Sequence, residues 1–161
     1  ATTLLRVNEL LRADTHSDLF VTMWYAMWDP RDGSLLYSSA GHNPPFILNQ
    51  QSGQIRLLKV KGIALGVFDN ITLQTAQTTL QPGEVLVMYT DGLTEAHSSS
   101  GEQFGVEGVQ AAIRAHSHEP ARHIIEAVID ALDAHTGDEP QFDDLTLVII
   151  RRAISETPPQ P

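Results

Sequence analysis

The sequence predicts an α+β domain in which helices cover one face of a mostly antiparallel sheet. Three observations lead to this prediction. Short apolar and aromatic runs separated by Pro, Gly and Asp turns fill the first half of the chain, two amphipathic helical patterns follow, and one more apolar run comes last. Strands followed by helices and a closing core strand are typical of a layered α+β arrangement.

The chain begins with a helical pattern and continues into a hairpin. Residues 2–12 place leucine and valine at helical spacing with polar residues between them, which predicts a helix. Residues 20–28 (FVTMWYAMW) and 35–39 are strand-like runs on either side of the Pro and Asp-Gly turn at 29–33. Two such runs around such a turn predict a β-hairpin.

Further strands are predicted in the middle of the chain. Residues 46–48 and 55–58 are apolar runs separated by the turn at 50–53. Residues 71–73, together with the threonines and glutamines after them, indicate a half-exposed strand. Residues 85–89 (VLVMY) are continuously apolar, which is expected of a buried central strand.

Two helices and a last strand complete the predicted domain. Residues 106–116 and 121–135 are amphipathic at helical spacing, with a break at Glu119-Pro120. Residues 145–150 (LTLVII) read as a buried strand. The proline-rich end, residues 153–161, is expected to be a disordered tail.

Composition excludes several function classes. Twenty carboxylates against ten Lys and Arg give a formal net charge of −10, which excludes nucleic-acid binding through phosphate neutralisation. The acidic excess is explained either by solubility or by carboxylates gathered around a divalent cation. Cysteine is absent, which excludes thiolate metal sites and fits a reducing compartment. No apolar run is long enough to insert in a membrane and no secretory signal is seen, so we expect a cytoplasmic location.

Acidic residues adjoin the two most apolar strands. Asp91 directly follows the run at 85–89, and Asp143 and Asp144 directly precede the run at 145–150. If these strands pair antiparallel, the end of one lies beside the start of the other, and the carboxylates converge. Strand-end carboxylates suit a hard cation. Each position is equally explained by a turn or a loop cap, and the pattern alone leaves both interpretations open.

Three glycine-containing stretches are further candidates for the site. Gly92 would let the backbone turn sharply so that Asp91 points along the strand axis. His42 and Asn43, in AGHNPP, stand either in a rigid turn or at a pocket rim in contact with substrate. Gly62 and Gly66, in GIALG, indicate a flexible flap or an ordinary loop.

Other hydrolase and nucleotide-binding motifs are missing. The sequence has no Gly-x-Ser-x-Gly elbow, no phosphate-binding Gly-x-x-x-x-Gly-Lys-Ser/Thr loop and no Gly-x-Gly-x-x-Gly stretch. A haloacid dehalogenase-like phosphatase needs an Asp two residues before a second Asp, and Tyr89 stands at that place before Asp91. These classes are therefore disfavoured.

Four ordered motifs resemble a known family. AGHNPP at 40–45, GIALG at 62–66, YTDGLTEA at 89–96 and DDLTLVIIR at 143–151 occur in this order in the bacterial PPM-type (protein phosphatase 2C-like) serine/threonine phosphatases. The similar subgroup is that of stage II sporulation protein E and the sigma-B regulator phosphatases. The resemblance covers residues 1–152.

The resemblance implies a fold and a chemistry. The fold would be a layered αββα sandwich of antiparallel sheets flanked by helices. Two Mn²⁺ or Mg²⁺ ions would activate a water that attacks phosphoserine or phosphothreonine, with no catalytic protein nucleophile. Asp91 with the adjacent Gly92 would stand at one metal position, and Asp143 or Asp144, with Asp144 favoured, at the second.

The sequence departs from the family at one motif. The first metal motif, Asp-x-Ser-Gly-Lys-Gly, is not present. We expect residues 1–152 to be the C-terminal two-thirds of the domain, truncated at its N-terminus, binding one ion or none and weakly active or inactive alone. The alternative is a natural loss that leaves a non-catalytic module, which binds its partner and signals by sequestration.

The resemblance also implies partners. The expected substrate is a phosphorylated anti-sigma-factor antagonist or a similar phosphoprotein, and the expected neighbour in the native chain is an upstream sensor or receiver domain. Sheet edges left open by missing strands would favour a homodimer or rearranged packing.

Overall fold

A computed structural model describes residues 1–14, 19–141 and 143–154. The predicted tail at 153–161 therefore lies almost entirely outside the described residues. The chain divides into two compact units. Unit 1 comprises Ala1–Pro44 and Leu57–Leu80, and unit 2 comprises Pro45–Arg56 and Gln81–Pro161.

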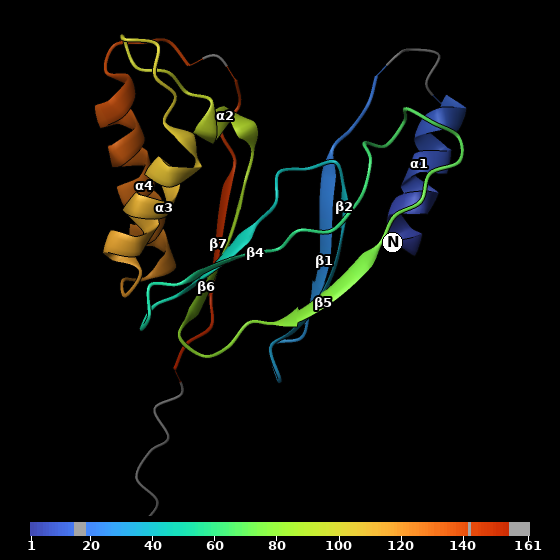
Figure 1. Ribbon diagram of the computed structural model, residues 1–161, viewed down its shortest axis with the longest axis horizontal. Helices are drawn as coiled ribbons and strands as arrows, with labels where there is room; N and C mark the ends of the chain where they lie inside the picture. Colours follow the sequence, from blue (N-terminus) through green and yellow to red (C-terminus); the bar gives the residue numbers. More distant parts are fainter. Residues whose placement is uncertain (15–18, 142, 155–161) are drawn as a thin grey trace, which may run out of the picture. The chain divides into compact units, whose positions relative to one another are not determined.

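The described residues of unit 1 form one helix and a three-stranded sheet (Figure 1). The helix α1 spans Thr2–Asp14. The strands β1 (Met23–Trp28), β2 (Ser34–Ala40) and β5 (Thr75–Thr79) pair antiparallel in the order β1-β2-β5. The β1–β2 hairpin forms around the Asp-Gly turn, where Gly33 has a φ of 81°. That left-handed conformation favours glycine.

Burial of α1 holds unit 1 together. Leu4 of the helix packs with Ala40 of β2 and with the loop residues Leu65 and Leu73. Asn8 is 1% exposed, and its side-chain amide forms hydrogen bonds with the loop at residues 66–68. Its Nδ2 donates to the Phe68 carbonyl at 3.0 Å, and its Oδ1 accepts from the backbone N–H of Gly66 at 2.8 Å. A buried amide that is satisfied in this way fixes the helix against the loop.

Unit 2 is built on a four-stranded antiparallel sheet (Figure 1). Its strands are β3 (Phe46–Asn49), β4 (Ile55–Leu57), β6 (Glu84–Tyr89) and β7 (Leu147–Arg151), in the order β4-β3-β6-β7. The central strand β6 pairs with β3 on one side and with β7 on the other. It is buried along almost its whole length, as its apolar run predicts.

In the described part of unit 2, three helices accompany the sheet. A single turn, α2 (Asp91–Thr94), follows β6, and α3 (Gly105–His116) and α4 (Ala121–Thr136) form a hairpin broken at Pro120. The hairpin covers one face of the sheet, where buried side chains from helices and strands form one core. These side chains are Phe46, Leu48, Val85, Val87, Tyr89, Leu93, Val109, Ile113, Ile124, Val128 and Leu132.

The predicted α+β fold, with antiparallel sheets flanked by helices, is confirmed, and three details are corrected. The last strand is not buried, since β7 lies at the edge of its sheet and Val148 is 43% exposed. Residues 71–73 are not a strand, since the ladder begins at Thr75. Leu73 is 7% exposed because it packs into the core of unit 1 from a loop, so its apolar character reflects burial without strand pairing. Phe20 lies outside β1 and is 63% exposed. Within the described residues, no helix is long and apolar enough to cross a membrane.

Candidate functional site

The acidic residues singled out in the sequence stand at adjoining ends of two paired strands. The strands β6 and β7 are antiparallel, and Tyr89 is opposite Leu147. Asp91 therefore begins α2 just beyond the end of β6, while Asp143 and Asp144 lie just before β7. All three aspartates are exposed. The antiparallel pairing, which was the condition for the carboxylates to converge, is present.

Thr90 ties the two acidic segments together. Its backbone N–H donates to the Thr146 carbonyl at 3.1 Å, so the β6–β7 pairing continues past the named strands. Its hydroxyl accepts from the Thr146 N–H at 3.0 Å and donates to the Asp144 carbonyl at 3.2 Å. Thr90, which directly precedes Asp91, thus joins the backbone that carries Asp91 to the backbone that carries Asp144.

Gly92 allows the two segments to approach closely. A Cβ at this position would lie 2.6 Å from the Asp144 carbonyl oxygen and 3.3 Å from the Asp143 Cβ. Gly92 is buried and is not among the glycines with positive φ. The expected reason for this glycine, a sharp turn, is therefore replaced by another: the site needs a residue without a side chain because backbone lies against it.

The aspartate side chains themselves have few protein partners. Asp143 Oδ1 accepts from the Asp144 N–H at 2.7 Å, and Gln141 Nε2 donates to the Asp143 carbonyl at 2.6 Å. Throughout the described parts of the chain, no salt bridge reaches Asp91, Asp143 or Asp144. Across the same residues, no three His, Asp or Glu side chains gather closely enough to hold a metal ion. Metal binding by Asp91, Gly92, Asp143 and Asp144 thus stays a prediction.

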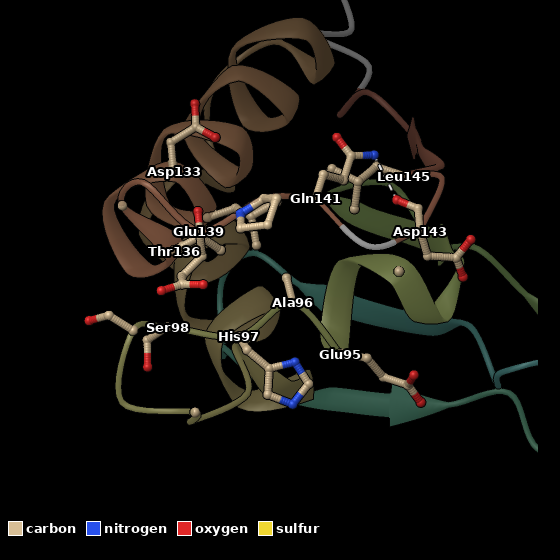
Figure 2. A pocket seen from close by; sticks show the side chains of 16 residues that line it. Glu95, Ala96, His97, Ser98, Asp133, Thr136, Glu139, Gln141, Asp143 and Leu145 are labelled. Atoms are coloured by element: carbon tan, nitrogen blue, oxygen red, sulfur yellow. Dashed lines mark hydrogen bonds between the residues drawn. The ribbon is translucent and has the colours of Figure 1, made fainter.

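A cavity of about 590 Å³ adjoins these segments in unit 2 (Figure 2). Gly92 and Asp143 line it, and Leu132 and Leu145 contribute apolar surface. Its other titratable lining residues are Glu95, His97, Asp133 and Glu139. Within the described residues, no Lys or Arg belongs to the lining. Four carboxylates without a compensating cation make this cavity unfavourable for a bare phosphate group.

Tyr89 belongs to the core of unit 2 and stands two residues before Asp91. It is 4% exposed, and its ring centroid is 6.2 Å from that of Phe46. Burial raises the pKa of Tyr89 above its ordinary value of 10.0, and the negative charge of Glu107 adds to the effect. The phenol is therefore uncharged at neutral pH.

The predicted substrate or flap residues lie in unit 1. His42 and Gly62 are brought together, because both line a second cavity. His42 Nδ1 is 3.1 Å from the Thr22 hydroxyl. Asn43 is half-buried and Gly66 binds Asn8, and neither lines that cavity.

Sequence reasoning missed Lys59 and Lys61, which line the same cavity as His42 and Gly62. They are the only lysines in the sequence, and they stand immediately before GIALG. The rarity of lysine was the available signal. Glu95 and Asp133, which line the cavity in unit 2, gave no comparable signal because exposed acidic residues are common in this chain.

Comparison with known proteins identifies the family. The family model "Stage II sporulation protein E (SpoIIE)" matches residues 1–153. Protein IcfG of Synechocystis sp. is 34% identical over 142 residues, which are 87% of this chain and 22% of that protein. Phosphoserine phosphatase RsbU of Bacillus subtilis is 27% identical over 151 residues, which are 94% of this chain and 44% of that protein. The chain thus spans less than half the length of these relatives.

Solved structures share the fold. The SiaA-PP2C domain of Pseudomonas aeruginosa has a TM-score of 0.80 at 24% identity, covering 94% of this chain and 60% of that one. The Mn-presoaked phosphatase domain of SpoIIE from Bacillus subtilis has a TM-score of 0.69 at 18% identity, covering 96% and 66%. The RsbU and RsbW domains of Rv1364c from Mycobacterium tuberculosis give 0.67 at 22% identity, covering 94% and 45%.

The family assignment agrees with the resemblance carried by the four sequence motifs. The matched span takes in all four of them, from AGHNPP to DDLTLVIIR, and both acidic segments at the ends of β6 and β7. The fold of the solved neighbours is the one predicted for such a domain. The chain therefore belongs to the stage II sporulation protein E (SpoIIE) family of PP2C-type phosphatase domains.

Proposed function

We propose that the protein hydrolyses phosphoserine on a small regulatory protein, using water activated by bound Mn²⁺ or Mg²⁺. The observation that carries this proposal is the joined position of two acidic segments, which Thr90 and Gly92 hold side by side at the ends of β6 and β7. Membership of the SpoIIE family supports the reaction class. The relative named phosphoserine phosphatase RsbU supports phosphoserine as the reacting group.

The residues present fit a hard divalent cation. The exposed carboxylates of Asp91 and of Asp144 or Asp143 would supply the oxygen ligands that such ions prefer. A bound cation supplies an activated water and compensates the charge of the phosphoryl oxygens. The neighbouring acidic cavity supports this requirement, since it would repel a phosphate ester if no cation were bound. The Mn-presoaked SpoIIE domain supports Mn²⁺ as a candidate.

Further ligands are expected from elsewhere in the native protein. The described residues hold no group of three candidate ligands, and this chain covers 60% of the solved SiaA-PP2C domain. We therefore propose that residues 1–152 are the C-terminal two-thirds of a phosphatase domain. On this proposal the chain alone is weakly active or inactive, and the full-length protein carries the complete centre.

The test is Mn²⁺-dependent hydrolysis of para-nitrophenyl phosphate by the full-length protein. We expect Asp91→Asn to lower kcat by about 100-fold or more, because it removes a metal ligand. The matched control is Asp130→Asn, the same change at an exposed position of α4 that lines neither cavity. Equal activity of Asp91→Asn and wild type would contradict the assignment of Asp91.

The second candidate function is a non-catalytic module that binds the same partner and acts by sequestration. It applies if the missing Asp-x-Ser-Gly-Lys-Gly motif reflects a natural loss in the native protein. A folded full-length protein with no Mn²⁺-dependent turnover, which still captures the unphosphorylated partner, would establish this function in place of hydrolysis.

We propose a phosphorylated anti-sigma-factor antagonist as the substrate and a sensor or receiver domain as the neighbour in the native chain. One solved relative carries RsbU and RsbW domains, which supports a regulatory partner. The large part of IcfG and RsbU outside the matched span supports additional domains. Release of inorganic phosphate from the phosphorylated antagonist, at a rate well above that from an unrelated phosphoprotein, is the expected result.

A further inference from the structure

A second cavity, of about 770 Å³, lies in unit 1 between three segments of the chain. AGHNPP contributes His42 and Pro44, the stretch before GIALG contributes Lys59 and Lys61, and the start of β5 contributes Thr75. We propose that this cavity binds an anionic segment of the protein substrate through its carboxylate or phosphoryl oxygens. This inference rests on the proposed function insofar as that function supplies a protein substrate.

The walls of this cavity are closely packed backbone. A Cβ on Gly62 would lie 1.7 Å from the Ser39 carbonyl oxygen, so this glycine is pressed against the end of β2. Gly41 has a φ of 72°, and a Cβ there would lie 2.9 Å from the Ala64 nitrogen. Each of the two segments, AGHNPP with the end of β2 and GIALG, therefore has a glycine that lies against the backbone of the other. Such contact fixes the segment that carries the lysines relative to the segment that carries His42.

Hydrogen bonds attach the segment at the start of β5, which also lines the cavity, to the other two segments. Ser38 is buried, and its hydroxyl donates to the Gln74 carbonyl at 2.7 Å. The Gln74 N–H in turn donates to the Lys61 carbonyl at 3.4 Å. The lysine-bearing backbone is thus attached to both β2 and the approach to β5. Lys59 and Lys61 extend from this support as exposed side chains.

The charge of the cavity is opposite to that of the chain. The formal net charge is −10, yet the only two lysines of the sequence line this one cavity together with His42. Among the residues that the structure describes, no Asp or Glu belongs to its lining. In the portion of the chain that the structure describes, neither lysine takes part in a salt bridge. The two ammonium groups are therefore available to a ligand.

This charge contrast identifies the kind of ligand. Lysine ammonium groups act as mobile point charges that bind phosphate and carboxylate oxygens. An acidic partner is repelled by most of this chain and attracted where the lysines lie, so the cavity would also set its orientation. Leu58, Val60 and Ala76 add apolar surface to the lining, which suits a peptide segment better than a free ion.

The test measures binding without turnover, in the full-length protein with EDTA present. The probe is a fluorescent phosphoserine peptide with Glu on both sides, and its anisotropy is followed at low salt. We expect the double variant Lys59→Gln/Lys61→Gln to weaken binding by about tenfold or more, as for the loss of two charge-assisted contacts. The double variant Lys59→Arg/Lys61→Arg should retain binding. EDTA separates the two proposals, because a failure to hydrolyse para-nitrophenyl phosphate does not affect this measurement.

A matched control removes two charges elsewhere. Arg6→Gln/Arg122→Gln takes away two exposed cations that pair with neighbours on their own helices, Glu9 and Glu126. We expect less than a twofold effect, and an equal loss in this control would overturn the proposal by showing that net charge alone governs binding. Wild-type affinity in the Lys59→Gln/Lys61→Gln protein would overturn it as well.

Two further peptides identify the oxygens that are bound. If the unphosphorylated peptide binds as tightly as the phosphorylated one, the flanking carboxylates are the ligand. If replacing Glu with Gln leaves binding intact and inorganic phosphate competes, the phosphoryl group is the ligand. Both results support an oxyanion site, provided that the binding depends on Lys59 and Lys61. Binding by all peptides alike, with no dependence on the lysines, would refute it.

Discussion

The Thr90 hydroxyl donates a hydrogen bond to the Asp144 carbonyl at 3.2 Å, between residues 54 positions apart in the sequence. The same oxygen accepts from the Thr146 N–H at 3.0 Å. One small side chain thus satisfies two backbone groups of the segment that carries Asp143 and Asp144. The relative position of the acidic segments depends on it.

Removing this hydroxyl should loosen the site. We expect Thr90→Val, which keeps the shape, to lower the free energy of unfolding by about 1 kcal/mol because both hydrogen bonds are lost. It should also weaken Mn²⁺ binding measured by calorimetry on the full-length protein. Thr90→Ser keeps the hydroxyl and is the control. Valine and serine variants with the same Mn²⁺ affinity would show that the hydroxyl has no part in positioning the acidic segments.

Gly92→Ala should destabilise the protein although Gly92 lies in a helix. Alanine in place of glycine usually stabilises a helix by about 1 kcal/mol. Here the added methyl group would meet the Asp144 carbonyl, and the expected result is a loss of about 1–3 kcal/mol in urea unfolding. Gly108→Ala in α3 is the control, since its Cβ would meet the Phe104 ring, a side chain that can shift. A stabilised Gly92→Ala protein would contradict the close approach.

Gly62→Ala should be among the most damaging single changes in unit 1. The methyl group would overlap the Ser39 carbonyl, and we expect a loss of about 3 kcal/mol or more in the free energy of unfolding. Gly101→Ala provides the comparison, because Gly101 has a φ of 81° but no atom within 4 Å of its Cβ. Its cost should be about 1 kcal/mol, from backbone strain alone. Similar losses in both variants would argue against the steric contact at Gly62.

Stability should fall in alkaline solution through Tyr89. Its folded pKa is raised above the ordinary 10.0, so the unfolded chain loses the phenolic proton first as pH rises. The contribution of the neutral phenol is complete below about pH 10 and is lost as pH rises through the folded pKa. We expect urea unfolding between roughly pH 9 and pH 11.5 to show a smaller loss of stability for Tyr89→Phe than for wild type. Parallel curves for the two proteins would refute this.

Much of the fold followed from periodicity, and the exceptions have physical causes. The apolar run at 85–89 predicted the central strand β6, because burial on both sides leaves little room for polar residues. Leu73 was assigned to a strand although it is buried from a loop, and apolar character alone does not distinguish these cases. The helix α2 has only four residues, which is too short to show a helical period.

The candidate site was predictable in its acidic segments but not in its supports. Asp91 and the Asp143-Asp144 pair were found because they adjoin recognisable apolar runs, which form the buried strand β6 and the edge strand β7. Thr90 was not singled out, since a threonine after a strand is common. Its role depends on a hydrogen bond to Asp144, which is 54 positions away in the sequence. The role of Gly92 could not be predicted, because it depends on where the Asp144 carbonyl lies, and no local sequence pattern gives that position.

The pairing of β6 with β7 has a consequence for the order of folding. The helices α3 and α4 occupy the sequence between the two strands and can associate through local contacts. The two acidic segments meet only after this long loop has closed, and closure of a long loop carries a larger entropic cost. We expect helical circular dichroism to recover early during refolding and the capacity to bind Mn²⁺ to appear last. We expect Val128→Ala, which weakens the core between the helices and the sheet, to delay the recovery of Mn²⁺ binding more than the recovery of helical circular dichroism.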